Sequence, residues 1–342
     1  MSSTVLVSVL VSMLNEASDI ANCIECIAAQ TWPRDQIELV LIDAESTDSS
    51  VHVATQAARD VGLANLVVCR NPERRTSIGL NLGLAAASGT FVVRVDARSR
   101  IEPRYIARCV ATLDEHPDVG VVGGAQAATA RDDTFAARSI ARALNNRWLT
   151  GFARYRRGGA SGPTDTVWMG AFRANDLRAL DGWDAGTALN EDYELNERYR
   201  ARGHVVWFDG DLRTGYLPRA KVRLVAKQYV SFGRVKADGW VHGRRPAPRQ
   251  IVLLALPPAF VAGTVAAAAS VGVVPVVVAA AVGVAAADLT GAPHGASLAD
   301  RAGALAVNGV VATCWWWGVA SGMVRSRRGN RPQAALAARP TR

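Results

Sequence analysis

The stretch TFVVRVDARS at residues 90–99 decides the fold that we predict for this chain. A short run of β-branched residues that ends in an acid is typical of a buried strand that delivers a carboxylate to its own carboxyl end. Ligands of open α/β sheets bind at that edge. The carboxylate of Asp96 is therefore a candidate anchor for a divalent cation and, through the cation, for a diphosphate. The alternative is an acid that caps the following loop.

The same pattern of a strand followed by an acid occurs twice earlier in the chain. Apolar strands are predicted at residues 5–14 and 37–43, and they end at Asn15-Glu16 and at Asp43. Helices and further strands alternate with them: helices at 18–30, 50–61, 74–88 and 103–115, and strands at 66–69 and at 119–122, the latter closed by Gly123-Gly124. Alternation at this spacing predicts βαβ units and a mostly parallel sheet.

Beyond residue 124 the pattern is less regular. Residues 151–164 are rich in Gly, Arg and Ser, which favours a mobile loop that can order around a ligand. An extended segment is expected at residues 165–170. A helix is expected from about residue 190 to 202, with Asn190 as its N-cap.

Composition excludes several classes of protein. The chain has 342 residues, 49% of them apolar, which is enough for one large domain or two small ones and excludes a mainly disordered protein. The net charge is +9, but the basic residues are not interleaved with aromatic ones, so we expect no nucleic-acid partner. The odd count of 5 cysteines favours a reducing compartment.

The charge pattern of the last third of the chain predicts a membrane region. Residues 251–289 carry no charge before Asp288, and this stretch is long enough to cross a hydrocarbon core of about 30 Å roughly twice. A further apolar segment at residues 302–324 precedes a basic tail. Three crossings would place that tail outside, against the positive-inside tendency, so two to three crossings stay open. A buried core helix is the alternative.

These features divide the chain into three expected parts. Residues 1–245 form a catalytic domain, residues 250–325 a membrane region of two to three hydrophobic helices, and residues 326–342 a basic flexible tail. The N-terminus lacks the basic region of a signal peptide, so the catalytic domain is expected in the cytoplasm. The expected location is the cell membrane, with a multi-pass or hairpin anchor.

The acids at element ends outline a site. Glu16, Asp43 and Asp96 follow strands, Asp192 begins a helix, and each loses hydration energy unless it meets a cation or a donor. Carboxylates that contact a nucleoside, a metal diphosphate and an acceptor hydroxyl would form a nucleotide-sugar site. The alternative is a Rossmann oxidoreductase, which requires G-x-G-x-x-G where residues 12–17 are SMLNEA.

A set of motifs supports the first of these alternatives. They are VSMLNE at 11–16, DAESTDS at 43–49, DAR at 96–98, DTVWMGAFR at 165–173, GWD at 182–184 and NEDYELNER at 190–198. Together they resemble the family 2 inverting glycosyltransferases of the GT-A fold over about residues 5–235. The later motifs are similar to the branch that includes the succinoglycan-type exopolysaccharide glucosyltransferases. The resemblance implies an α/β GT-A fold, to which C-terminal transmembrane helices are added here.

The resemblance also implies a role for each matching residue. The implied roles are a nucleoside pocket lined by Asn15, Glu16 and Asp43, a diphosphate contact from Arg75, a divalent cation, Mg²⁺ or Mn²⁺, at Asp96, and a general base at Asp192 beside Glu191.

Two positions depart from the family pattern. Arg98 stands where the family has a second acid or, in the related branch, often His; the loss of one oxygen ligand weakens metal binding, and Arg98 itself can face the diphosphate. A solvated loop residue is the alternative. Gln228 and Arg234 occupy the place of the Q-x-x-R-W element near the acceptor or diphosphate, with a different spacing and no Trp. The basic residues at 221–236 also suit an interfacial helix on anionic lipid.

The resulting expectation is a membrane-anchored inverting glycosyltransferase. It would move a sugar from a nucleotide-sugar donor, expected to be a UDP-sugar, to a lipid-linked saccharide in exopolysaccharide or cell-surface glycan biosynthesis. Its partners would be the donor, the acceptor and membrane lipid. The alternatives are a polyprenyl-phosphate glycosyltransferase and an inactive scaffold of a polysaccharide assembly.

Overall fold

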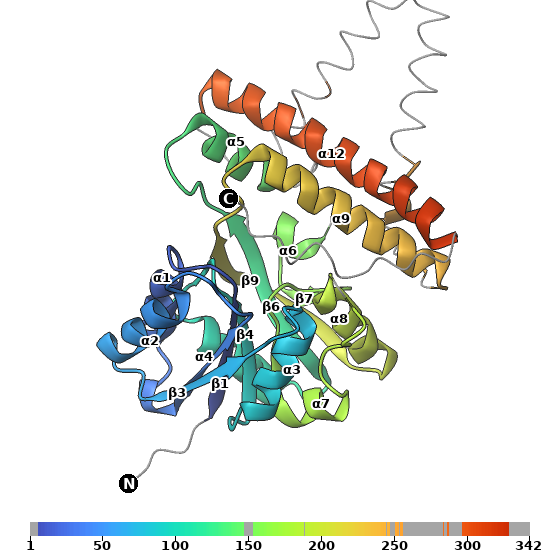
Figure 1. Ribbon diagram of the computed structural model, residues 1–342. Coiled ribbons are helices and arrows are strands. Elements are labelled where there is room, and N and C mark those ends of the chain that lie inside the picture. Colours follow the sequence, from blue (N-terminus) through green and yellow to red (C-terminus); the bar gives the residue numbers. More distant parts are fainter. Residues whose placement is uncertain are drawn as a thin grey trace, which may run out of the picture. The chain divides into compact units, whose positions relative to one another are not determined.

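The strand predicted from residues 90–99 is β4 (Phe91–Asp96), and it pairs in parallel with β1 (Val7–Met13) in the computed structural model (Figure 1). On its other side β1 pairs in parallel with β2 (Ile37–Asp43), which pairs in parallel with β3 (Asn65–Arg70). The predicted βαβ units are thereby confirmed for the first half of the sheet. The structure describes residues 6–146, 153–187, 189–243, 245–246, 250–252, 254–255, 283, 286 and 296–327.

The second half of the sheet is antiparallel. Its strands are β5 (Ser99–Ile101), β6 (Val119–Ala128), β7 (Gly162–Pro163), β8 (Ala171–Arg173) and β9 (Val205–Tyr216). β8 pairs with both β4 and β6, and β9 pairs with β5 and β7. Within the described residues the nine strands follow the order β3-β2-β1-β4-β8-β6-β9-β5, with β7 beside β9.

Helices cover both faces of the sheet. They are α1 (Ile20–Ala28), a 3-10 helix (Arg34–Gln36), α2 (Ser50–Asp60), α3 (Thr76–Ala86), α4 (Tyr105–Glu115), α7 (Ala174–Ala179) and α8 (Glu191–Ala201). Alternate residues of a strand point to opposite faces. Val9 and Val11 belong to one buried cluster with α1, α2 and α4, whereas Leu10 meets α3 at Gly83 on the other face. Burial on both faces explains the continuous apolar runs of β1, β2 and β4.

Two predictions of local structure are wrong. β6 does not end at Gly123-Gly124 but continues to Ala128, because Gly124 has no side chain and lets the backbone of Leu212 in β9 approach closely. The predicted loop at 151–164 contains α6 (Arg154–Arg157) and β7 within its described residues. Pairing with β9, which lies more than forty residues further along the chain, orders β7.

Two further predictions are partly wrong. The segment predicted as extended at 165–170 joins the sheet only after its end, at β8, and Met169 within it has a left-handed φ of 53°. Asn190 precedes α8 as predicted, but its φ is 63° and its side chain makes no capping hydrogen bond. A left-handed backbone is one that Asn tolerates better than most residues, so Asn190 serves the turn rather than the cap.

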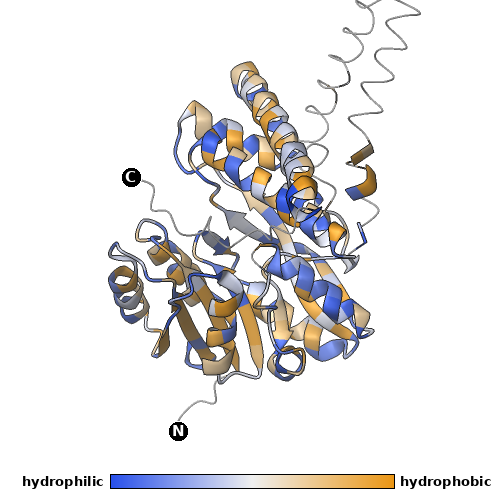
Figure 2. Cartoon of the chain, turned by 45° about the vertical axis from the view of Figure 1, so that its right-hand side comes forward, coloured by the Kyte–Doolittle hydropathy of each residue, from blue (hydrophilic) through white to orange (hydrophobic). Residues whose placement is uncertain are grey.

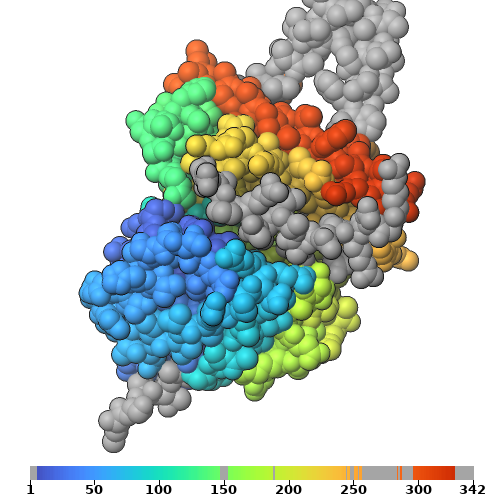
Figure 3. Space-filling model, viewed as in Figure 1, coloured from blue at the N-terminus to red at the C-terminus, as the bar shows by residue number. Residues whose placement is uncertain are grey.

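The chain divides into two units. The first contains the described parts of Met1–Ala127 and Gly158–Leu217, and the second contains those of Ala128–Arg157 and Pro218–Pro332. The helices of the second unit are α5 (Phe135–Leu144), α6, α9 (Val222–Val241) and α12 (Leu298–Arg327). Figure 3 shows the surface of α9 (yellow) beside that of α12 (red).

The second unit is built on a close parallel pair of helices, α9 and α12. Gly233 lies against Gly318, and Gly322 lies against Ala237, so the two helices run in the same direction with small residues at their contact. Small residues let two helix backbones approach each other closely. The small residues at these positions thus allow close packing between two helices that more than fifty residues separate in sequence.

The predicted membrane segments are covered only in part. The predicted crossings within residues 251–289 lie almost entirely outside the described residues. The apolar segment predicted at 302–324 is confirmed as the body of α12, which among the described residues is the one helix long and apolar enough to cross a membrane. Length and composition alone do not separate a membrane span from a core helix.

The helix pair makes a testable prediction about glycine. A Cβ at Gly318 would overlap the carbonyl oxygen of Val230 in α9, whereas a Cβ at Gly309 on the same helix would meet nothing within 4 Å. We expect Gly318→Ala to destabilise the protein by about 1–3 kcal/mol. Gly309→Ala, the matched control, should be neutral or stabilise it by up to about 1 kcal/mol. Chemical denaturation in detergent measures both, and equal effects would contradict the close contact.

Candidate active site

The predicted donor-site acids lie at one edge of the sheet. The register of the parallel strands places Asp43 of β2 and Asp96 of β4 on either side of the end of β1. Asn15 and Glu16 follow β1 after one residue. The structure therefore brings together the residues predicted from these three strands, because the carboxyl ends of parallel strands meet at the same edge.

Hydrogen bonds join the turn after β1 to the turn after β2. The amide of Asn15 donates to Oγ of Ser46 at 2.9 Å, and Oδ1 of Asn15 accepts from the amide of Thr47 at 2.8 Å. The amide of Ser46 donates to the carboxylate of Asp43 at 3.2 Å. Asn15 has a left-handed φ of 55°. The side chains of Asn15 and Asp43 thus shape the turns that border the site.

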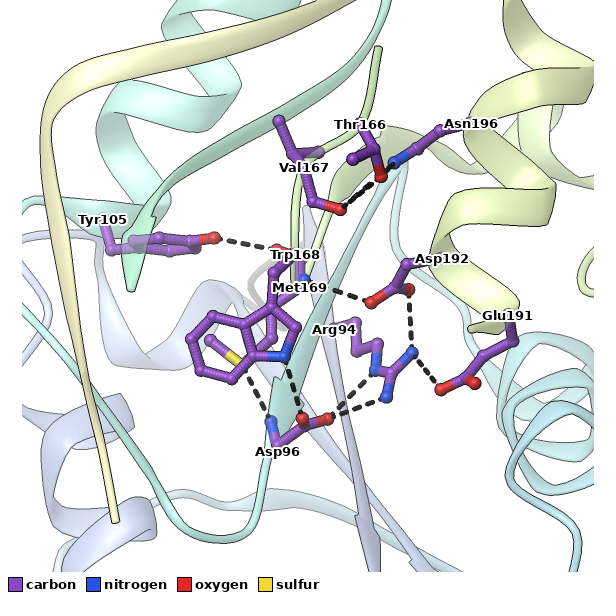
Figure 4. Close-up of polar contacts among 10 residues, drawn as sticks. All are labelled: Arg94, Asp96, Tyr105, Thr166, Val167, Trp168, Met169, Glu191, Asp192 and Asn196. Carbon is purple, nitrogen blue, oxygen red and sulfur yellow. Dashed lines mark hydrogen bonds and ion pairs between the residues drawn. The ribbon is translucent and has the colours of Figure 1, made fainter. Parts of the chain in front are cut away.

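A buried arginine on β4, Arg94, is the centre of the site (Figure 4). Its side chain contacts three carboxylates: Nε donates to Oδ1 of Asp96 at 3.0 Å, and Nη1 lies 2.7 Å from Oδ1 of Asp192 and 2.8 Å from Oε1 of Glu191. Arg94 is only 5% exposed. These carboxylates raise the pKa of Arg94 well above its ordinary value, although its burial acts in the opposite direction.

Sequence reasoning missed Arg94. It stands inside a strand whose other residues before the final acid, FVV and V, are apolar and buried. A charge in such a strand needs partners, because an unpaired buried charge is very costly. A lone arginine in the central strand, two residues before a candidate ligand, was the signal that could have identified it.

Asp192, the predicted base, lies in the first turn of α8 and its side chain is largely buried. Burial raises the pKa of Asp192 to about 6; Arg94 opposes this rise, and the negative charges of Glu191 and Asp96 add to it. Oδ1 of Asp192 is held by Arg94, whereas Oδ2 has a long contact of 3.4 Å with the amide of Met169. A carboxylate with this pKa suits a general base near neutral pH.

The segment before β8 contributes two contacts that sequence reasoning also missed. Nε1 of Trp168 donates to Oδ2 of Asp96 at 3.2 Å, and the amide of Asp96 lies 3.1 Å from Sδ of Met169. Nδ2 of Asn196 in α8 donates to the carbonyl of Val167 at 3.1 Å, which ties this segment to the helix that carries the predicted base. Both carboxylate oxygens of Asp96 therefore accept hydrogen bonds from the protein.

Arg98 pairs with another predicted donor-site residue. Its Nε lies 3.3 Å from Oε1 of Glu16, and its side chain is 22% exposed. Burial lowers the pKa of Arg98, but Tyr216, Glu16 and Asp96 outweigh that effect and raise it. Partial burial with an acidic partner does not match the alternative of a solvated loop residue.

The helix α3 begins beside Arg75, the residue predicted to contact a diphosphate. Arg75 occupies the N-cap position of α3, and within the described residues its Nε is buried without a hydrogen-bond partner. The start of a helix carries a partial positive charge and free amides, which favour anions. The other two residues predicted for the diphosphate or acceptor region, Gln228 and Arg234, lie on α9 in the second unit, where Nε of Arg234 donates to Ser321 at 3.2 Å.

The residues around Asp96 fit a divalent cation with one protein carboxylate. Within the described chain no three His, Cys, Asp or Glu side chains are grouped as metal ligands. The side chain of Asp96 is 27% exposed, and its Oδ2 accepts a hydrogen bond from Trp168 at 3.2 Å. Mg²⁺ is commonly bound by one or two carboxylates and takes its other ligands from substrate phosphates and water. Asp96 can supply the protein ligand of such a site, and Arg98 supplies none.

Comparison with known proteins gives relatives that cover most of the chain. This chain is 29% identical over 253 residues to the succinoglycan biosynthesis protein ExoA of Rhizobium meliloti (strain 1021). The aligned region covers 73% of this chain and 75% of that protein. It is also 21% identical over 235 residues to a protein of Methanococcus voltae named dolichyl N-acetyl-alpha-D-glucosaminyl phosphate 3-beta-D-2,3-diacetamido-2,3-dideoxy-beta-D-glucuronosyltransferase. That aligned region covers 67% of this chain and 72% of that protein.

A solved structure shares the fold. The mannosyltransferase PcManGT from Pyrobaculum calidifontis, in complex with GDP-Man and Mn²⁺, matches with a TM-score of 0.62 and 24% identity, covering 92% of this chain and 88% of that one. At this identity the likeness shows the GT-A-like α/β fold alone. The predicted fold class is confirmed in this respect.

The fold and the relatives define an enzyme of the glycosyltransferase class. The profile described as Glycosyl transferase family 2 matches residues 8–180, about half of the chain, and the protein belongs to that family. The resemblance inferred from the motifs is confirmed.

The contacts of Arg94 make a prediction about pH. Arg94 opposes the rise in the pKa of Asp192, so we expect Arg94→Met to move the acid limb of the kcat profile to higher pH. It should also cost about 3–5 kcal/mol of stability, because it leaves buried carboxylates unpaired. Arg94→Lys keeps the charge, and it should shift the limb less.

A second variant separates the two effects. Arg108→Met breaks a bidentate pair with the buried Asp209 in the same unit. It should lower the melting temperature and leave the acid limb of kcat unchanged. An unchanged limb in both Arg94 variants, with the protein folded, would show that Arg94 does not act on the base.

Proposed function

We propose that this glycosyltransferase moves a sugar, with inversion, from a nucleotide-sugar donor to a lipid-linked saccharide at a membrane. The observation that carries the proposal is the contact of one guanidinium, Arg94, with both Asp96 and Asp192. A donor-side carboxylate and an acceptor-side base are thereby held on opposite sides of a single buried charge. An inverting transfer needs a base on the face of the anomeric carbon opposite the leaving diphosphate, and one charge that positions both carboxylates supports this division of roles.

In this proposal the donor lies along the carboxyl edge of β1, β2 and β4. The turns that contain Asn15, Glu16 and Asp43 line the nucleoside pocket. Arg75 faces the diphosphate, and its buried Nε, which has no hydrogen-bond partner among the described residues, supports that role at the start of α3. Arg98 places its charge on the same side, where it pairs with Glu16.

Asp96 would hold a divalent cation, Mg²⁺ or Mn²⁺, which when bound stabilises the charge of the departing diphosphate. The hydrogen bond from Trp168 and the two contacts from Arg94 fix the orientation of the carboxylate. A fixed ligand positions the donor without further reorganisation.

Asp192 acts as the general base in this proposal. Arg94 holds its Oδ1, which leaves Oδ2 to accept the proton of the acceptor hydroxyl as that oxygen attacks the anomeric carbon. A pKa of about 6 keeps Asp192 mostly ionised at neutral pH and still basic enough to take a proton. Glu191 shares the guanidinium and keeps it in place.

The membrane parts of the proposal concern the C-terminal region. Residues 1–245 form the cytoplasmic catalytic part and residues 250–325 the membrane region, ahead of the basic tail at 326–342. A lipid-linked acceptor would reach the enzyme at the bilayer surface, where Gln228 and Arg234 of α9 are available to contact it. The relative from Methanococcus voltae, which is named for a dolichyl-linked sugar, supports an acceptor of this kind.

A donor panel tests the function. The purified full-length protein, in detergent with crude bacterial lipid, is incubated with UDP-, GDP- and dTDP-sugars, and release of nucleoside diphosphate is measured. We expect turnover with one UDP-sugar and its dependence on the lipid. Transfer to polyprenyl phosphate alone would favour a polyprenyl-phosphate glycosyltransferase, and no turnover with any donor would favour an inactive scaffold.

The role of Asp192 makes the next prediction. Asp192→Asn should retain donor binding and lower kcat by about 10²-fold or more, since general-base catalysis contributes typically about 10²–10⁴. Asp181→Asn is the matched control, because Asp181 is exposed in the same unit and its left-handed φ of 58° suits Asn. Near-normal turnover of Asp192→Asn would place the base elsewhere.

The roles of Asp96 and Arg98 can be separated by metal titration. Asp96→Ala should abolish transfer at any Mg²⁺ or Mn²⁺ concentration, because the described residues contain no cluster of three or more His, Cys, Asp or Glu side chains that could hold the metal in its place. Arg98→Ala should weaken donor binding, and excess metal should restore part of the loss. Full activity of the unmodified protein in EDTA would show that Asp96 is not a metal ligand and that arginines neutralise the diphosphate.

A further inference from the structure

The helix α12 exposes a continuous apolar face. Exposed residues recur every three or four positions along its whole length, and those that we call the apolar stripe are Leu298, Ala302, Ala306, Trp317, Ala320 and Val324. Leu298 is 85% exposed and Trp317 is 64% exposed. The exposed positions between Ala306 and Trp317 carry no charge either. Figure 2 shows white and orange residues along much of α12.

The opposite face of α12 is held by α9 and α5. Ser321 accepts a hydrogen bond from Arg234 of α9, and the hydroxyl of Ser326 donates to Asp238 of α9 at 2.7 Å. Near the other end of α12, Asp300 forms an ion pair of 3.0 Å with Arg138 of α5. Polar contacts at both ends therefore fix which face of α12 is packed and which is exposed.

The charges of α9 are difficult to reconcile with a crossing by α12. Gly233 lies against Gly318 and Ala237 against Gly322, so each residue of α9 lies level with the residue of α12 about 85 positions later. Arg223 and Lys227, both exposed, are then level with the middle of α12. If α12 crossed a bilayer with α9 attached, these two charges would lie near the centre of the hydrocarbon, where exposed Arg and Lys are strongly disfavoured.

We propose that α12 lies in the plane of the membrane, with its apolar stripe resting on the lipid. The inference deepens the proposed membrane association and depends on it. The occupant is a bilayer surface with anionic lipid, because two exposed basic residues, Arg325 and Arg327, follow the stripe at the end of α12. A helix with an apolar face and basic flanks binds at this boundary.

The inference also settles the count of crossings that the sequence left open. If α12 does not cross, the candidate left in the sequence is residues 251–289, which carry no charge before Asp288 and whose length suits about two crossings. The basic residues after α12 then stay on the same side as the catalytic domain, as the positive-inside tendency requires.

Spin labels along α12 test the inference in the full-length protein. The variants A302C, A306C and A320C are labelled, the protein is reconstituted in vesicles of phosphatidylcholine and phosphatidylglycerol, and the depth of each label is measured from its accessibility to oxygen and to a water-soluble nickel chelate. Labels at Arg223→Cys and Lys227→Cys on α9 are the water-facing controls. Cys314 and the other native cysteines are replaced by Ser in every variant.

An in-plane helix and a crossing helix give different depth profiles. We expect all three stripe labels at the same shallow depth, about 5–10 Å into the boundary of headgroups and acyl chains, with the α9 controls in water. A crossing helix would separate the outer two labels by about 27 Å along its axis. That profile, or stripe labels reached only by the nickel chelate, or by neither reagent because protein covers them, would overturn the inference.

The same samples keep this inference separate from the proposed function. Transfer from nucleotide sugars is measured before labelling in the reconstituted vesicles, to which the crude bacterial lipid of the donor panel is added as the source of acceptor. Transfer without the shallow profile would overturn the in-plane placement alone. The shallow profile without transfer from any donor would overturn the proposed function and leave the placement of α12 standing.

Discussion

The buried guanidinium of Arg94 constrains the rest of the catalytic unit. A charge at this depth is stable only when partners surround it, and the strand β4 itself supplies one, Asp96, two residues further on. The other two, Glu191 and Asp192, come from almost a hundred residues later in the chain. The first turn of α8 must therefore pack against the end of β4, because Arg94 would otherwise lack two of its three partners.

The segment between β7 and β8 makes this approach possible. Val167 and Trp168 lie between the two carboxylate-bearing elements, one bonded to Asn196 of α8 and the other to Asp96 of β4. Tyr105 of α4 donates to the carbonyl of Met169 at 2.8 Å and helps to hold the segment in place. The left-handed backbone of Met169 is part of the same turn. Structure and chemistry thus depend on the same few contacts, which is expected where strain and buried charge occur together.

The sequence predicted the parallel half of the sheet because its signals are local. Continuous apolar strands that end in acids specify both a buried strand and the edge at which the acids meet, so Asp43 and Asp96 could be placed together without a structure. The antiparallel half was less predictable, because pairing with distant strands orders the two-residue β7 and extends β6 past its glycines. Local propensity contains no information about such partners.

The site was predicted where a residue type at a strand end already suggests its chemistry, and missed where a contact defines it. Asp192 could be proposed from its motif, but its elevated pKa depends on burial and on charged neighbours on β4 and on its own helix. The sequence presented Trp168 only as one residue of an extended segment, whereas in the structure its indole donates a hydrogen bond to Asp96. Arg94 was visible in the sequence as a charge in an apolar strand. Only the three-dimensional fold could show which carboxylates neutralise it.

In the membrane region, too, the composition of a segment does not determine its surroundings. An apolar helix of thirty residues is equally consistent with a crossing, a core helix and a surface helix, because these differ in what surrounds the helix and not in its own residues. For α12 the decision comes from α9, a helix that carries Arg223 and Lys227 beside the centre of α12. A neighbour that cannot enter the hydrocarbon keeps its partner out of it as well, so the charge of one helix determines the environment of the other.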